Sequence, residues 1–98
     1  MDVRRVIGAN VRKHRIAVGL SQEELALRIE IFDQGYVSGL EAGRRNPTAV
    51  TLWLIASALG VRPGDLFSTD GFSEAWARGP VTLSSTRSRR KSIIPRTK

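Results

Sequence analysis

Residues 21–47, SQEELALRIEIFDQGYVSGLEAGRRNP, decide the fold of this 98-residue chain. Two short helical patterns follow each other here, and the break at residues 30–33 contains neither glycine nor proline. Ser21 and Glu24 predict a capping box for the first helix, and Asp33 predicts the N-cap of the second. The second helix, residues 34–42, is polar and holds two glycines, each costing roughly 1 kcal/mol of helix stability relative to alanine. A helix that only fills a core gains nothing from this composition, so its outer surface is expected to have a function.

The sequence on either side predicts further short helices. Upstream, one helix ends at Gly19 and carries an apolar face at helical spacing, made of Val3, Ile7, Val11, His14 and Val18. Downstream, a helix begins after the N-cap Thr48 and ends at Gly60, with an inward face of Val50, Leu52, Ile55, Ala56 and Leu59. Pro63 starts a short fifth helix that carries Leu66 and Phe67. We therefore predict an all-α domain of five helices over residues 1–67.

The charge of the chain is unevenly distributed. Residues 1–77 carry nine basic and nine acidic residues, so residues 78–98 hold the whole net charge of +7. A neutral domain followed by a basic tail indicates a polyanionic partner, although on charge alone a solubilising end is an equal explanation. We expect residues 68–78, with Phe72, Ala75 and Trp76, to be a packing or dimerisation segment. Residues 79–98 are expected to be a flexible basic tail, with a short strand at 80–84.

Several classes of protein are disfavoured by composition. The chain has no cysteine, no apolar run of the ~20 residues that span a bilayer, and no signal-peptide pattern at its start. These features favour a cytoplasmic protein of bacterial or phage type. A single histidine and the absence of a glycine-rich phosphate loop argue against an enzyme, a metal site or a cofactor. We interpret His14 as an imidazole at the edge of the core.

Two helices joined by a short turn can cross at a steep angle, so that the first braces a DNA backbone while the second enters the major groove. Such a unit needs a small residue at the helix contact, for which Ala26 is placed. It also needs apolar anchors on the second helix, which Val37 and Leu40 provide. Short or hydrogen-bonding side chains then form the outer face, and glutamine suits adenine. This face comprises Gln34, Gly35, Tyr36, Ser38 and Gly39.

A family resemblance supports this interpretation. The sequence combines GLSQEELA at residues 19–26, VSGLEAGRRNPT at 37–48, and the spaced Leu52, Ile55, Ala56, Leu59, Leu66 and Phe67. It resembles the XRE family of lambda-repressor-like helix-turn-helix proteins, and within it the restriction–modification controller proteins. The resemblance covers about residues 5–67. It implies a five-helix DNA-binding domain that acts as a dimer on a two-fold operator.

The resemblance also implies roles for individual residues. Gln22 would touch a phosphate or an outer base, and Arg44 and Arg45 would hold the DNA backbone. The groove-facing residues above, together with their cap Asp33, would contact the bases. Arg15 and Glu41 match a pair that forms an internal ion pair in the family.

The sequence departs from the family pattern at the turn. Glu30 replaces the usual glycine, and Glu30 to Val37 is one position longer than is typical. A left-handed residue without glycine is unfavourable, so we expect the extra residue to let the chain bend without one. His14 is the second departure, because an aliphatic residue is common there.

We predict a sequence-specific, double-stranded DNA-binding transcriptional regulator, a dimeric repressor or autoregulator without a cofactor. Trp53 and Leu54 lie beside the core stripe, and Phe67, Phe72 and Trp76 follow downstream. Either residues 68–78 fold back over the helix that begins after Thr48, or these residues form a homodimer seam. We favour a dimer that involves the fifth helix and residues 68–78. The alternative is an antitoxin-type module whose C-terminal segment binds a partner protein. A fixed apolar docking surface would favour the antitoxin, and a mobile basic arm would favour the plain regulator.

Overall fold

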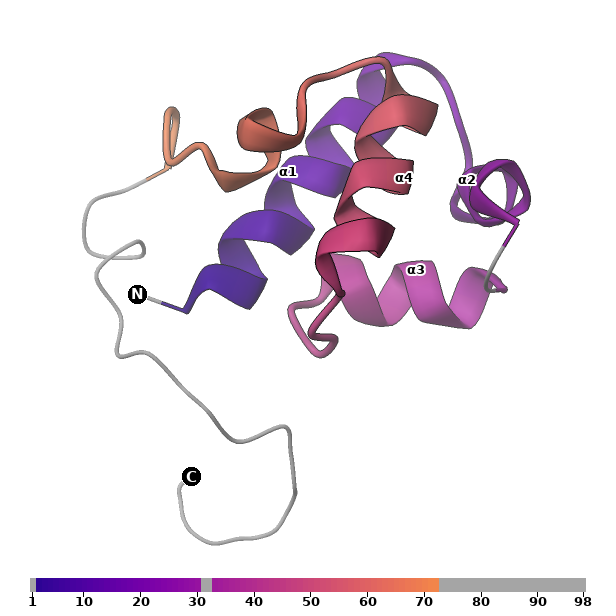
Figure 1. Cartoon of the computed structure of the whole chain (residues 1–98), viewed down its shortest axis with the longest axis horizontal. Helices are drawn as coiled ribbons and strands as arrows, with labels where there is room; N and C mark the ends of the chain where they lie inside the picture. The colour runs from indigo at the N-terminus through magenta and orange to yellow at the C-terminus, as the bar shows by residue number, and fades with distance from the viewer. Residues whose placement is uncertain (1, 31–32, 73–98) are drawn as a thin grey trace, which may run out of the picture.

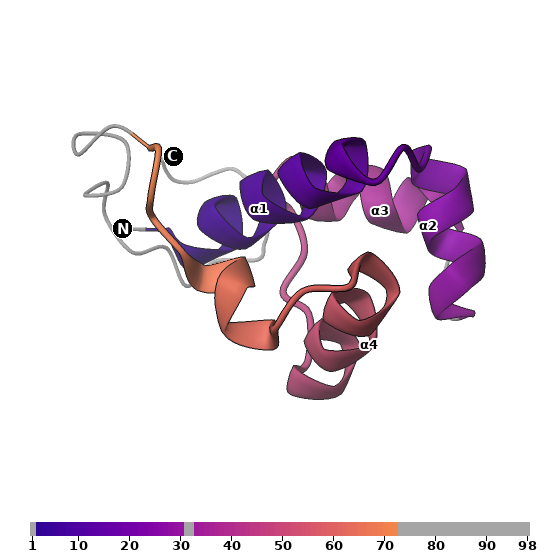
Figure 2. The ribbon, with the colours of Figure 1, turned by 90° about the horizontal axis from the view of Figure 1, so that it is seen from above.

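The computed structural model describes residues 2–30 and 33–72. This part of the chain forms α1 (Val3–Ala17), α2 (Gln22–Ile29), α3 (Gln34–Glu41), α4 (Ala49–Leu59) and η1 (Pro63–Phe67). Figure 1 shows α3 along one edge of the molecule. In Figure 2, α1 and α3 lie next to each other on one side, and α4 lies on the other. No strand occurs among the described residues, so the all-α class is confirmed for them.

The helix ends follow the local chemistry that the sequence predicted. The Ser21 hydroxyl accepts the Glu24 N–H at 3.0 Å, and the Glu24 carboxylate accepts the Ser21 N–H at 2.7 Å, which completes the capping box. Asp33 Oδ1 accepts the Tyr36 N–H at 3.1 Å at the start of α3. Thr48 caps α4 in the same way, and Gly60 ends it with a positive φ of 73°. Each cap satisfies a backbone group that the helix leaves without a partner.

One face of each α-helix contributes side chains to the hydrophobic core. Its fully buried centre consists of Leu25, Val37, Leu40, Ile55, Leu66 and Val11. Thirteen apolar side chains are buried within residues 2–30 and 33–72, which suffices for a small domain only when they are closely packed. The core therefore fixes α3 from its inward side, through Val37 and Leu40.

Three apolar residues expected in the core are exposed instead. Val3 and Val18 are 42% and 51% exposed, and Val50 is 68% exposed. The first two lie at the ends of α1, beyond the helices that pack on it, and Val50 is in the first turn of α4. The buried stripe of α1 runs through Val6 and includes the polar Asn10 and Arg15. The helical spacing predicted the buried face of α1 correctly in the middle of the helix, but not at its two ends.

The turn between α2 and α3 corrects a second prediction. Glu30 adopts the left-handed conformation, with φ 56° and ψ 25°, and its N–H donates to the Ala26 carbonyl at 3.2 Å. We had expected the longer turn to avoid such a residue. The left-handed residue closes the last turn of α2 as a glycine would.

The fifth helix is a single 3-10 segment rather than an α-helix. Pro63 begins η1 as predicted, and Leu66 is fully buried. Asn10 fixes this segment to α1, because its Nδ2 donates to the Leu66 carbonyl at 2.9 Å and to the Ser68 carbonyl at 2.8 Å. The chain after η1 is thereby held beside α1 as far as Ser68.

Several predictions lie outside the described residues. They are the helical turns at Ala75 and Trp76, the strand at 80–84 and the basic tail at 79–98. Within residues 2–30 and 33–72, no helix has the length and apolar character needed to cross a membrane. The same residues contain no cluster of side chains that would ligate a metal ion.

Candidate nucleic-acid interface

The position of α3 is set by a close crossing with α1. A Cβ atom on Gly8 would overlap the Leu40 carbonyl oxygen and lie 2.9 Å from that of Glu41. Only glycine allows this approach of the two backbones. Ala26, 2% exposed, is the small residue on α2, as predicted. The helix that carries the expected base contacts is therefore fixed from within.

A buried ion pair holds the C-terminal end of α3. Arg15 Nε lies 2.6 Å from Glu41 Oε2, and Arg15 Nη2 donates to Glu41 Oε1 at 3.0 Å. Arg15 Nη1 also donates to the Leu20 carbonyl at 2.8 Å. The hydrogen bonds that Arg15 donates to the Glu41 carboxylate raise the pKa of the Arg15 guanidinium above its ordinary value, so the group remains charged at any accessible pH. The pair links α1 to α3, as the resemblance implied.

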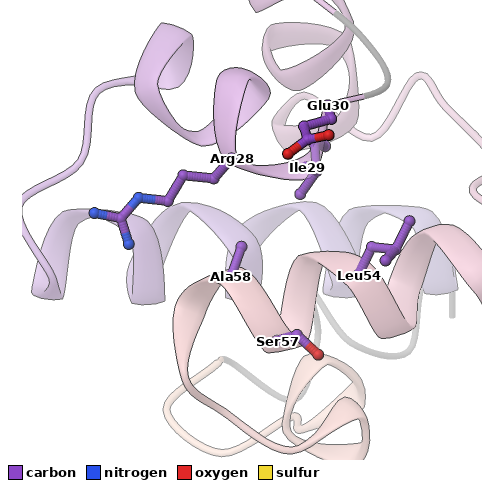
Figure 3. A pocket seen from close by; sticks show the side chains of 6 residues that line it. All are labelled: Arg28, Ile29, Glu30, Leu54, Ser57 and Ala58. Atoms are coloured by element: carbon purple, nitrogen blue, oxygen red, sulfur yellow. The ribbon is translucent and has the colours of Figure 1, made fainter.

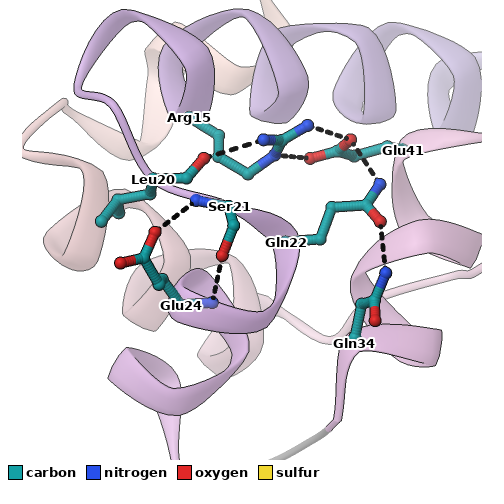
Figure 4. A network of polar contacts seen from close by, with 7 residues as sticks. All are labelled: Arg15, Leu20, Ser21, Gln22, Glu24, Gln34 and Glu41. Carbon is teal, nitrogen blue, oxygen red and sulfur yellow. Dashed lines mark hydrogen bonds and ion pairs between the residues drawn. The ribbon is translucent and has the colours of Figure 1, made fainter.

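The ion pair extends to the surface through two glutamines (Figure 4). Gln22 Nε2 donates to Glu41 Oε1 at 3.1 Å, and Gln34 Nε2 donates to Gln22 Oε1 at 3.2 Å. The carboxylate only accepts hydrogen bonds, so the amide of Gln22 must turn its NH2 group inward and its oxygen toward Gln34. The orientation of Gln34 is thus set by a buried charge on the same helix.

The outer face of α3 is open at its N-terminal end. Asp33, Gln34 and Gly35 are exposed, whereas Tyr36 and Ser38 are half-buried. Gly39, which we expected on this face, is buried. The accessible part of the predicted face is therefore the first turn of α3, together with the half-buried Ser38.

The two arginines after α3 differ in their surroundings. Both Arg44 and Arg45 are exposed. The guanidinium carbon of Arg45 lies 5.3 Å from the centre of the Tyr36 ring, which is a cation–π arrangement. Burial raises the pKa of the Tyr36 phenol, and the charge of Arg45 acts in the opposite direction. Arg45 is thus directed back toward the first turn of α3.

Two features of this surface were not predicted from sequence. The amide bond between Gln22 and Gln34 depends on how α2 and α3 cross, which spacing alone does not give. The contact of Arg45 with Tyr36 joins a loop to a helix nine positions earlier. The contact of Arg45 with Tyr36 did leave a signal in the sequence, namely Gly39. A glycine within a short helix indicates that another group approaches the backbone closely.

A cavity of about 540 Å³ opens between the end of α2 and α4, away from this surface. It is lined by Arg28, Ile29, Glu30, Leu54, Ser57 and Ala58 (Figure 3). None of these residues belongs to the ion pair, the glutamine network or the predicted groove-facing set. The cavity is therefore separate from the candidate interface.

Two short consecutive helices in contact, with the second held from within and exposed at its first turn, define a helix-turn-helix DNA-binding protein. The helix-turn-helix family HTH_3 matches residues 11–66, so the chain belongs to that family.

Similar proteins include both curated relatives and solved structures. An uncharacterised HTH-type transcriptional regulator, y4dJ of Sinorhizobium fredii, is 51% identical over 62% of this chain and 78% of its own length. The control protein C.BamHI of Bacillus amyloliquefaciens is 37% identical over 74% of this chain and 93% of its own. The crystal structure of the restriction–modification controller protein C.AhdI from Aeromonas hydrophila is 41% identical. It superposes with a TM-score of 0.62 over 65% of this chain and 96% of its own. The fold, the site and these relatives identify the class as DNA-binding transcription regulators.

Proposed function

We propose that this protein regulates transcription by placing the first turn of α3 in the major groove of a specific operator. The observation that carries the proposal is the connection from buried Glu41 through Gln22 to exposed Gln34. One Nε2 hydrogen of Gln34 is used by Gln22, while its second hydrogen and its Oε1 remain for a base edge. These are the donor and acceptor that adenine N7 and N6 require in a bidentate contact.

Further contacts follow from the same placement. Gly35 is exposed next to Gln34 and lets the α3 backbone approach the DNA closely. Arg44 and Arg45 supply positive charge beside α3 for phosphate oxygens, while the domain as a whole is neutral. Relatives named as regulators and control proteins support a regulator rather than an enzyme. Such a protein acts on DNA in the cytoplasm.

The test of base reading begins with selection of bound sites from random duplex DNA. Gln34→Ala should weaken binding to the selected site by about 1–3 kcal/mol and relax the preference for adenine at one position of each half-site. Leu27→Ala, an exposed change on α2 at a residue that is neither groove-facing nor on α4, is the matched control and should bind as the wild type does. Equal affinity and unchanged base preference in Gln34→Ala would contradict the proposal.

We also propose a homodimer formed through the apolar surface of α4 and η1. Trp53, Val50 and Phe67 are 63%, 68% and 46% exposed, which is unusual for large apolar side chains of a small domain. A two-fold dimer would set its recognition helices about 34 Å apart, one turn of DNA. This spacing matches an operator with two half-sites.

Sedimentation of the full chain tests the dimer. Trp53→Glu places a charge on the proposed seam, so the expected product is a monomer that still folds but binds a single half-site weakly. Leu27→Glu is the control, because Leu27 is 71% exposed on α2, outside that seam. A monomeric wild type that binds a separate protein through residues 68–98 would instead support the antitoxin-type alternative.

A further inference from the structure

The side chain of Arg45 lies across α3 and does not simply extend from its loop. Its stem passes Gly39, two positions before the last residue of α3, and its guanidinium reaches the ring of Tyr36 near the start. The arginine therefore runs along the edge of the helix that the proposed function places in the groove. Arg44, one position earlier, makes no such contact in the described part of the chain.

The absence of a side chain at Gly39 makes this path possible. A Cβ atom there would lie 3.0 Å from Arg45 Nε and 3.3 Å from its Cγ, which is closer than side chains normally approach. Apart from the backbone of α3 itself, the three atoms nearest to that Cβ position all belong to Arg45. Gly39 is also buried. The Arg45 stem thus occupies the space that a side chain would fill.

Tyr36 provides the other end of the path. Its ring is half-buried and thus restricted in its motion, and it presents a face to the guanidinium. An arginine that is already held against a ring loses less conformational freedom when it binds than one that moves freely. Stacking leaves the N–H groups in the guanidinium plane directed outward as hydrogen-bond donors.

We propose that Gly39 and Tyr36 are positioning residues, which hold the Arg45 guanidinium against α3 as a fixed donor for acceptor atoms of duplex DNA. This inference rests on the proposed function, because it deepens the description of the same interface. It assigns Gly39 a role through Arg45, whereas the sequence pattern placed Gly39 on the face that would contact the bases directly. The two explanations make different predictions.

The arrangement can be tested first in the free protein. Tyr36 is the only tyrosine of the chain, so the absorbance change at 295 nm on titration reports its phenol alone. Removing or displacing the Arg45 charge should raise the phenol pKa further, because that charge lowers it in the wild type. We expect this shift in Arg45→Gln and in Gly39→Leu. Arg44→Gln, which removes the same charge one residue away, should leave the titration unchanged.

Binding to the selected operator provides the second measurement. Gly39→Ala should raise the thermal stability, because alanine favours a helix and only the flexible Arg45 side chain must move. The same variant should bind DNA about two- to fivefold more weakly, the range expected for loss of one partly exposed cation–π contact. Opposite signs for stability and affinity would exclude simple misfolding as the cause.

A double-mutant cycle separates an effect through Arg45 from a direct contact of Gly39 with DNA. In the Arg45→Ala background, Gly39→Ala should cause no further loss of affinity. An undiminished loss in that background would overturn the inference. So would identical phenol titrations in the wild type, Arg45→Gln and Gly39→Leu. A wild type that selects no DNA site would contradict the proposed function instead, while the titration would still decide whether the stack exists.

Discussion

The two ends of α3 are held by different kinds of contact. At the C-terminal end, α1 approaches so closely that Gly8 admits no side chain, and the buried pair of Arg15 and Glu41 adds two hydrogen bonds. At the N-terminal end, the exposed cap Asp33 and the amide of Gln34 make single hydrogen bonds near solvent. The comparison indicates that the C-terminal, inner end fixes the position of α3. The N-terminal, outer end can adjust its side chains to a binding partner.

Breaking the inner end should have the largest effect. Glu41→Gln leaves the buried Arg15 charge without its counter-ion, so we expect a loss of about 3–5 kcal/mol in the free energy of unfolding. Urea denaturation measures this loss. The double replacement Arg15→Met with Glu41→Leu is the control, and it should be far less destabilising than either partner removed alone. A loss below about 1 kcal/mol in Glu41→Gln would mean that the pair is effectively solvated.

The close crossing is the second target. Gly8→Ala would force the backbones of α1 and α3 apart, because the new methyl group meets backbone oxygens that cannot turn away. We expect a net loss of about 1–3 kcal/mol from overpacking, measured by the same denaturation. In Gly64→Ala the added Cβ meets nothing within 4 Å, so the stability should change little. Equal stability of both variants would contradict the crossing.

The C-terminal end of α2, just before α3, offers a change of opposite sign. Glu30 is the one non-glycine residue with positive φ among those described, at 56°. Glu30→Gly should therefore stabilise the protein, by up to about 1 kcal/mol, since relief of strain exceeds the added freedom of the unfolded chain. Gly60→Ala tests the same conformation in reverse, because Gly60 has φ 73° and open space around it, and should destabilise. Thermal unfolding of both variants should give melting temperatures shifted in opposite directions.

The smallest effect is expected at the start of α2. The hydrogen bonds from the Ser21 backbone and hydroxyl lower the pKa of Glu24. Because the folded pKa lies below the unfolded one, the carboxylate favours the folded state above the ordinary glutamate value. This contribution is lost as the pH falls from that value through the folded pKa. Glu24→Gln should lack this part of the acid destabilisation, whereas Glu23→Gln, outside the capping box, should retain it in melting curves from pH 7 to pH 3.

The sequence predicted what depends on neighbours along the chain. The caps Ser21, Asp33, Thr48 and Gly60 and the buried Val37 were correct, because each depends on residues within a turn or two. Glu30 was misjudged, since turn length alone does not determine how a helix ends. The exposed ends of α1 were also wrong, because periodicity does not tell where packing partners stop.

The sequence predicted which residues belong to the candidate interface, but it did not predict the contacts between them. Residues 34–39 were chosen because of their position on a second helix, and the structure leaves the first turn of that helix exposed. The ion pair of Arg15 and Glu41 came only from the family resemblance. The bond from Gln22 to Gln34 and the path of Arg45 over Gly39 depend on angles between elements. Such angles follow from the whole core rather than from any local pattern.

The unequal anchoring of α3 has a consequence for engineering. The inward side chains Val37, Leu40 and Glu41 are buried and hold α3 against the rest of the domain. Positions 34 and 35 are exposed and position 38 is half-buried, so the three could be varied together in a library while the buried residues of α3 stay unchanged. Retargeting this regulator to a new operator would then require the exchange of a few exposed side chains of α3, while the core of the domain stays the same.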